Sequence, residues 1–421
     1  MVKGDHYVTS KEFLAIWRRF SDHFIPWDEF RLLPMPPGVD AMEAWEVVAK
    51  LRREMATVLD YPPWFPYVEG GSIWFSTPKK SQNMLLDISA VTAEGASLSR
   101  SITKMDGYHF CQYLMLDEFI AACASDGVEI DPERARRAAF HRDEPQSDGE
   151  RLFVNLCNTF AYAGVTYKGR DITYGLIEDI GRDMAKGIGS DIGHVGMFEL
   201  ANPEVFTPDY VLGLICRLAA GKGASDPLHP VIASGEMSRM FWDLRPLERF
   251  NACVELVVRK IFYANTGQPA CAFVHATRVE RAWRERGGAE GGVFLASGYP
   301  AEYMLDGVDG TLYHDMTLRH MVRELDILDN KVRSFANKRK RQKRKLDEEG
   351  GFNEREKDVI LNLLRNPTVK VTIGRHRERH GIAYSTAHDD LAHLEAEGIL
   401  RAGKEGRAIV YHAGSGLQEL V

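Results

Sequence analysis

The chain has no apolar run approaching 18 residues, and its first 25 residues carry charges throughout. A membrane-spanning helix needs about 20 mostly apolar residues, so the sequence predicts neither a membrane span nor a signal peptide. Its six cysteines include no CxxC pair, and most of them lie in apolar runs, as in Leu214-Ile-Cys216. Cysteine packs there as a small hydrophobic side chain. The pattern therefore indicates a reducing cytoplasm and disfavours a disulfide framework or structural zinc.

Internal repeats and long low-complexity tracts are also missing from the 421 residues. This length predicts two or three domains, and 44% hydrophobic with 27% charged residues is typical of a globular chain with a substantial core. The net charge of −7 disfavours a protein that binds polyanions over its whole surface. A nucleic-acid site would have to be a local patch.

What the chain does contain is a series of helical patterns. Ser10 and Asp40 are suited to cap helices at 10–22 and 40–58, and "SIWFST" suits a short strand. From 151 to about 325 the pattern is almost entirely helical. A basic run follows at 331–345, with nine Lys and Arg in 15 positions, which favours phosphate contacts with a steep salt dependence. A solvated linker helix is the alternative interpretation of this run.

A compact module at 352–413 gives the clearest pattern. Asn353 is suited to cap a helix, and "VKVTI" at 369–373 suits a short strand. A basic helix around 374–380 then ends at Gly381, and Ser385 or Thr386 is suited to cap a third helix. "LRAGKEGRAIVYH" resembles a strand, a glycine-containing wing and a second strand. This order predicts a winged helix-turn-helix, which places the third helix in the major groove of DNA.

The predicted partner is therefore double-stranded DNA, without a membrane. Candidate contacts come from the second and third helices, the wing and the basic run: Arg375, Arg377, Tyr384, Ser385, Thr386, His388, Arg401, Lys404, Arg407, Lys338, Arg339, Lys340 and Arg341. Asp389 weighs against this interpretation, because an acidic side chain facing phosphates weakens binding. A winged helix that serves protein contact or homodimerisation stays open as an alternative.

A second segment, Arg245-Pro-Leu-Glu-Arg-Phe-Asn-Ala-Cys253, lies between two helical patterns and resembles the HPFxDGNGRxxR loop of the Fic family. Flanking segments at 169–180 and 229–269, and the winged-helix module at 384–412, resemble the same family. The loop keeps Pro246 and Asn251 but replaces the residues that carry the chemistry. The His, acidic, two Gly and two Arg positions hold Arg245, Arg249, Phe250, Ala252, Cys253 and Leu256.

The resemblance implies a nucleotidyl-transfer loop that has lost its working groups. In such a loop the His is the general base and the acidic residue holds Mg²⁺. Arg245 cannot act as a base at neutral pH, and Arg249 cannot bind a cation. The loop is then either a plain turn between helices or an anion or nucleotide site formed by Arg245, Arg249 and Asn251 without turnover. No catalytic residue and no cofactor is predicted.

Two further groups give weaker patterns. "GIGSDIG" at 187–193 follows a helix rather than a strand, which indicates a flexible connection instead of a dinucleotide loop. His314-Asp315 and His320 could ligate a metal on one helical face, but no third ligand lies at suitable spacing, so the histidines are predicted to lie on the surface, and no metal site is expected.

The predicted fold is mostly α, with a Fic-like helical core and a C-terminal winged helix-turn-helix. Its parts are an N-terminal helical region at 1–65, the core at 66–325, a basic linker at 326–350, the winged helix at 351–413 and a tail at 414–421. The leading hypothesis is a non-catalytic regulator that binds DNA. The alternatives are a divergent Fic-type enzyme that transfers AMP to a protein hydroxyl, and a protein-interaction or dimerisation module.

Overall fold

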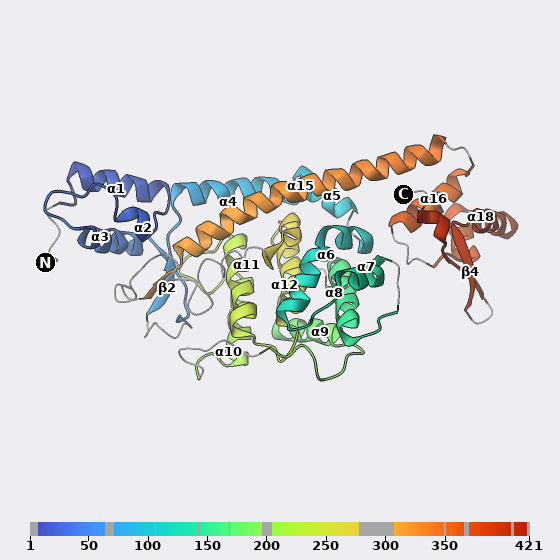
Figure 1. Cartoon of the computed structure of the whole chain (residues 1–421), viewed down its shortest axis with the longest axis horizontal. Coiled ribbons are helices and arrows are strands. Elements are labelled where there is room, and N and C mark those ends of the chain that lie inside the picture. Colours follow the sequence, from blue (N-terminus) through green and yellow to red (C-terminus); the bar gives the residue numbers. More distant parts are fainter. Residues whose placement is uncertain are drawn as a thin grey trace.

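The structure is a computed structural model that describes residues 7–63, 71–105, 107–140, 144–167, 169–195, 204–277, 307–348, 351–365, 370–405 and 408–418. Helices dominate it, as the sequence predicted, and the few strands are short (Figure 1). Three groups of buried apolar side chains follow one another along the chain. Among the described residues, no helix has the length and apolarity to cross a membrane.

The first group is an aromatic-rich bundle at the N-terminal end. It contains α1 (Lys11–Asp22), α2 (Trp27–Phe30) and α3 (Ala41–Glu54). The predicted caps are confirmed, because Ser10 accepts from the amide of Phe13 at 3.1 Å and Asp40 from that of Glu43 at 2.8 Å. The helix predicted at 40–58 ends at Glu54, because the strand of Thr57 and Val58 follows.

A small mixed sheet joins this bundle to the core. It contains β1 (Thr57–Val58), β2 (Ser72–Phe75) and β3 (Gly307–Asp309) in the order β1-β2-β3. The strand expected in "SIWFST" is thereby confirmed; it pairs antiparallel to β1 and parallel to β3. Arg52 of α3 closes the junction with a buried ion pair to Asp309 at 2.8 Å.

The core is a helical body built around the largest hydrophobic cluster (Figure 1). Its helices are α4 (Lys79–Thr92), α5 (Ser97–Met105), α6 (Tyr108–Ser125), α7 (Pro132–Phe140), α8 (Asp148–Thr166), α9 (Tyr174–Met184), α10 (Pro208–Ala219), α11 (Pro230–Arg239) and α12 (Asn251–Asn265). A π-turn at Met240–Leu244 and a 3₁₀ turn at Pro269–Phe273 flank α12. Every residue from Asn251 to Tyr263 is buried, so α12 is the central helix of the body.

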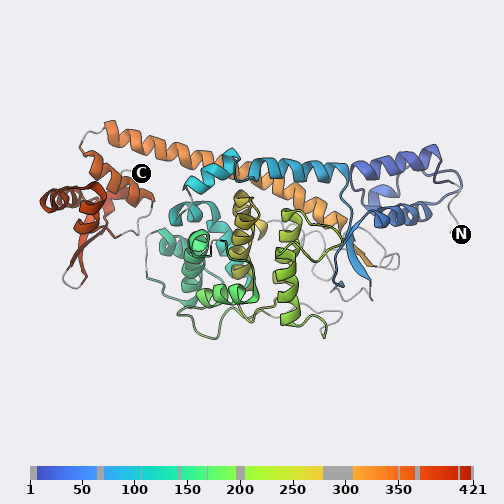
Figure 2. The same cartoon turned by 180° about the vertical axis from the view of Figure 1, so that it is seen from behind.

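Helix α15 (Thr311–Glu348) runs from the core to the C-terminal module without interruption (Figures 1 and 2). Its first part buries Leu318, Leu325 and Val332 against the core, and Leu346 near its end enters the C-terminal cluster. The basic run at 331–345 is therefore part of one long helix, in which Val332 and Phe335 still pack on the core, whereas Lys338, Lys340, Arg341, Arg344 and Lys345 are exposed.

The C-terminal module contains α16 (Glu354–Arg365), α17 (Ile373–His380), α18 (Tyr384–Ala396), β4 (Leu400–Glu405) and β5 (Ala408–Ala413). Gly381 ends α17 with a φ of 61°, a left-handed conformation that favours glycine. β4 and β5 pair antiparallel as the wing. The predicted winged helix-turn-helix is thus the observed fold.

Two details of this module differ from expectation. Within the described residues 370–373, the predicted strand at 369–373 is reduced to a single bridge between Val371 and Tyr411, because α17 already begins at Ile373. Helix α18 begins at Tyr384 after Ala383, so neither Ser385 nor Thr386 caps it.

Candidate functional sites

The loop between α11 and α12 has a backbone conformation that favours glycine, at positions that hold other residues. Arg245 has a φ of 40° and Phe250 a φ of 62°, and these are the non-glycine residues with positive φ in the described part of the chain. The left-handed region costs about 1–2 kcal/mol for a residue with a Cβ atom. The chain therefore enters α12 through a sharp turn at Phe250 that is costly for a residue with a side chain.

Asn251 holds this loop closed from within. Its side-chain oxygen accepts from the amide of Leu247 at 2.9 Å, and its side-chain nitrogen donates to the Leu247 carbonyl at 2.8 Å. The side chain is buried and serves as a clamp on the loop backbone. Both ends of the Asn251 amide are thereby engaged, so the group expected to help hold an anion instead orders the turn.

The first amides of α12 bind a carboxylate that belongs to the chain itself. Asp126, at the end of α6, accepts from Ala252 N at 3.0 Å and from Cys253 N at 2.9 Å. Arg245 Nη1 lies 3.8 Å from the same carboxylate, and its Nη2 donates to the Ser125 carbonyl at 3.2 Å. Asp126 is buried. The positive end of the helix, where a phosphate would bind, thus has an internal anion.

Arg249 covers the outer side of the loop. Its guanidinium donates to the Gly189 carbonyl at 2.6 Å and stacks 4.7 Å from the centre of the Phe250 ring. The Phe250 ring packs on Gly193, which belongs to the glycine-rich connection at 187–193. That connection therefore covers the outer side of the loop.

Gly193 is the most constrained point of this cover. It has a φ of 85°, and a Cβ atom there would lie 2.1 Å from a carbon of the Phe250 ring. Gly193→Ala is expected to lower the free energy of unfolding by about 2–4 kcal/mol through overpacking and backbone strain. Gly175→Ala in α9 is the matched control, because a Cβ atom there meets nothing within 4 Å. Equal denaturation midpoints for the two variants would contradict the packing described.

Asp126 makes the loop sensitive to pH. Burial raises the pKa of Asp126 to about 6, although the amides of Ala252 and Cys253 and the charge of Arg245 lower it. The unfolded value is about 3.9, so folding takes up a proton between about pH 4 and 6. The stabilisation that this group contributes is therefore fully present below about pH 4 and is lost as the pH rises through 6.

Asp126→Asn removes this proton uptake. The free energy of unfolding of the wild type minus that of the variant is expected to fall by about 2 kcal/mol between pH 4 and pH 7. Denaturant titrations of both proteins at several pH values measure the difference, and other titrating groups cancel. A difference that is flat or rises with pH would show that Asp126 is ionised throughout.

The residues predicted to contact DNA lie on the surface of the winged helix. Arg375 and Arg377 of α17, Tyr384, Ser385 and His388 of α18, and Arg401 and Lys404 of β4 are exposed, and Thr386 is half-buried. Lys338, Lys340 and Arg341 are exposed on α15. Arg407 and the side chain of Arg339 lie outside the described residues.

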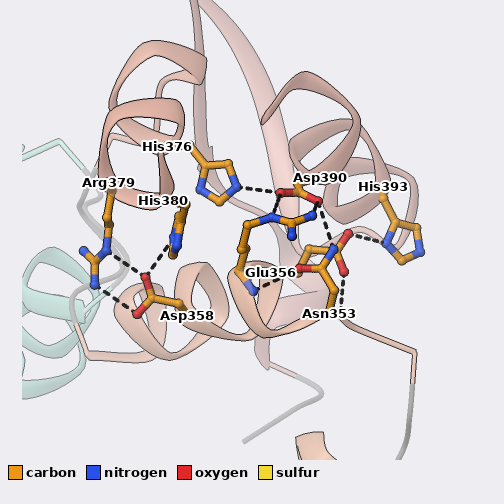
Figure 3. A network of polar contacts seen from close by, with 9 residues as sticks. Asn353, Glu356, Asp358, His376, Arg379, His380, Asp390 and His393 are labelled. Atoms are coloured by element: carbon orange, nitrogen blue, oxygen red, sulfur yellow. Dashed lines mark hydrogen bonds and ion pairs between the residues drawn. The ribbon is translucent and has the colours of Figure 1, made fainter. Parts of the chain in front are cut away.

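Beneath this surface, Asp390 joins the three helices of the module (Figure 3). Its carboxylate accepts from Arg355 Nε at 2.8 Å, Arg355 Nη2 at 2.9 Å and Asn353 Nδ2 at 2.9 Å, and it lies 3.0 Å from His376 Nε2. Desolvation raises the pKa of Asp390, but the bonds from Arg355, His376 and Asn353 outweigh it and hold that pKa well below its usual range. One carboxylate of α18 thereby fixes this helix against α16 and α17.

A second set of contacts surrounds this centre (Figure 3). His393 of α18 lies 2.9 Å from Glu356, and His380 of α17 lies 3.3 Å from Asp358. Sequence reasoning did not find these pairs, although Asn353 and Glu356 have the spacing of a capping box: Glu356 accepts from the amide of Asn353 at 2.7 Å. The module thus positions α18 by polar contacts as well as by its apolar core.

Charge is distributed unevenly along the chain. Residues 331–413 contain 19 Lys and Arg against 12 Asp and Glu, a net charge of +7, whereas the whole chain has −7. The remainder is therefore strongly acidic. Most of this positive charge lies on α15, because 331–345 contain nine Lys and Arg and no Asp or Glu, whereas 351–413 contain ten Lys and Arg against nine Asp and Glu. The basic run of α15 is therefore the local patch that the composition required.

The described residues contain no group of three His, Cys, Asp or Glu placed to hold a metal. The expectation of surface histidines is wrong for His314, which is buried beside Glu236 at 3.3 Å. Burial lowers the pKa of His314 to about 4, so it is neutral at physiological pH. Asp315 is also buried and pairs with Arg319 at 2.7 Å.

Comparison with known proteins gives a structural likeness but no match of sequence. No protein-family model matches the chain, and no curated protein matches it. Among solved structures, the chain is similar to a Fic family protein from Desulfovibrio desulfuricans G20, with a TM-score of 0.40 and 11% identity over 79% of this chain and 96% of that one. A likeness at this level leaves function to be argued from the residues of this chain.

Proposed function

We propose that the protein is a non-catalytic regulator that binds double-stranded DNA through its winged helix and the basic part of α15. The observation that carries the proposal is the basic run at 331–345, which has nine Lys and Arg and no Asp or Glu and leads into the winged helix, in a chain of net −7. A protein that neutralises phosphates needs such a patch, and a generic surface does not produce it.

The geometry of the module supports this binding mode. Helix α18 buries Ala387, Leu391 and Leu394 and exposes its opposite face, as a recognition helix must. Exposed basic side chains lie on the elements that precede and follow α18: Arg375 and Arg377 on α17, and Arg401 and Lys404 on β4. In this arrangement α17 and the wing would contact phosphates and α18 would reach the bases.

The variant Arg375→Ala/Arg377→Ala/Arg401→Ala/Lys404→Ala tests the assignment in the full chain. Without these cationic side chains at the phosphates, binding to a duplex is expected to weaken about 100-fold or more at about 50 mM salt. Fluorescence anisotropy with a labelled duplex measures it. Unchanged affinity would contradict DNA binding by the winged helix and favour a module for protein contact or dimerisation.

The absence of catalysis is supported by the loop between α11 and α12. Arg245 stands where a Fic loop has its base, and Arg249 where it has its Mg²⁺ ligand. Ala252 N and Cys253 N, at the start of α12, bind Asp126. An ATP phosphate would have to displace this buried carboxylate and would meet no group able to accept a proton from a target hydroxyl.

We therefore expect no transfer of AMP. Incubation of the protein with labelled ATP, Mg²⁺ and a lysate should label no protein above a control without the chain. Label that appears with the wild type and disappears with Arg245→Ala or Asn251→Ala would establish the alternative, a divergent nucleotidyltransferase. The same ATP should leave the melting temperature unchanged, since Asp126 occupies the anion position.

A further inference from the structure

Two neighbouring aspartates of α18 have opposite environments. Asp390 is buried and accepts from Asn353 and Arg355, with His376 at 3.0 Å (Figure 3). Asp389 has 80% of its side chain exposed and lies 3.4 Å from His388 Nδ1. The first has a clear part in folding. The second contributes little to the fold, since an exposed contact of this kind contributes roughly 0–1 kcal/mol.

Asp389 lies on the outward face of the helix. Residues three and four apart share one face of a helix, so Asp389 is grouped with Ser385, and His388 lies beside them. All three are exposed, whereas Ala387 and Leu391 on the opposite face are fully buried. Within the proposed function, this outward face is the one that enters the major groove.

The charge of Asp389 opposes general DNA binding. It would repel any phosphate that it faced. On a helix face that contacts base edges, a carboxylate favours binding only where it lies opposite a hydrogen-bond donor of a base. In the major groove, the pairing that geometry favours for Asp is with the N4 amino group of cytosine.

We propose that Asp389 is a specificity-determining residue, which accepts a hydrogen bond from the N4 amino group of one cytosine in the bound site. The inference rests on the proposed DNA binding and adds to it the identity of one base pair. His388, beside the carboxylate, belongs to the same contact surface. Asp389 thus lowers affinity for all DNA and restores it at sites that offer a cytosine at this position.

The test is selection of bound duplexes from a random pool by the full chain at about 150 mM salt, with wild type and Asp389→Asn in parallel. The wild type should enrich sites with cytosine at one position, and changing that pair should weaken binding about 5- to 150-fold. Asp389→Asn should shift the preference at this position toward adenine, because asparagine pairs with N6 and N7 of adenine. Its affinity for non-specific duplex should rise.

Glu397→Gln is the matched control. Glu397 is an exposed acid that follows the last turn of the same helix, so its replacement changes the net charge equally. It should raise non-specific affinity in the same way and leave the cytosine preference intact. If Asp389→Asn also keeps the wild-type preference, the inference fails while DNA binding stands. If the wild type binds no duplex, the proposed function fails and the inference with it.

Discussion

Neutralising three charges on α15 is expected to weaken DNA binding about 10- to 100-fold for every sequence alike. The variant is Lys338→Gln/Lys340→Gln/Arg341→Gln, and all three side chains are exposed. Contacts to phosphates carry no sequence information, so specific and non-specific duplexes should weaken by the same factor. The slope of log affinity against log salt should become shallower by about three units, one for each phosphate that is no longer neutralised. Anisotropy titrations over a range of salt concentrations measure both quantities.

The matched control removes the same charge at the other end of the molecule. Lys11, Arg18 and Arg19 are exposed on α1, which lies far from the winged helix in both views (Figures 1 and 2). Their replacement by glutamine should change affinity only slightly, because charges beyond the Debye length of about 10 Å are screened. An equal loss of affinity in the two triple variants would mean that net charge, and not the exposed part of α15, governs binding.

Asp390→Asn is expected to destabilise the winged helix by about 2–3 kcal/mol. The change leaves the partly buried Arg355 without its carboxylate and removes acceptors from Asn353 and His376. Amides of α16, α17 and α18 should then exchange with solvent about 30- to 150-fold faster, because opening of the module becomes more frequent. Amides of α12 in the core should be unaffected. Hydrogen exchange read by mass spectrometry separates the two regions.

The stabilisation that Asp390 provides depends on pH in a defined direction. The folded-state pKa of Asp390 lies well below the usual range, so its stabilisation is present above about pH 4 and is lost as the pH falls toward the folded pKa. The difference in exchange between wild type and Asp390→Asn should therefore shrink in acid. Asp389→Asn, one residue away and 80% exposed, should leave exchange unchanged. If hydrogen exchange accelerated similarly in both variants, Asp390 would not be the residue that holds the three helices of the module together.

Local signals in the sequence predicted what depends on neighbouring residues. Helix caps at Ser10 and Asp40 involve residues three apart, and the winged helix has a short, ordered series of helices and strands with Gly381 at its turn. These features need no knowledge of which distant segments meet.

Contacts between distant segments could not be predicted in this way. Asp126 reaches Ala252 across 126 residues, and nothing near either residue indicates the pairing. Asp390 has the same appearance in the sequence as Asp389, yet only Asp390 is buried, because Asn353, Arg355 and His376 converge on it. The basic run likewise resembled a linker, since only the tertiary structure shows that α15 continues through it.

The measurement that tests the proposed function most directly is the salt dependence of duplex binding by the full chain. A labelled duplex is titrated at several salt concentrations between about 50 and 200 mM. Six or more phosphate contacts from α15 and the winged helix predict clear binding at the low end and an affinity about 10³-fold or more weaker at the high end. No binding at about 50 mM, or an affinity that does not change with salt, would contradict the proposal that this positive surface binds DNA.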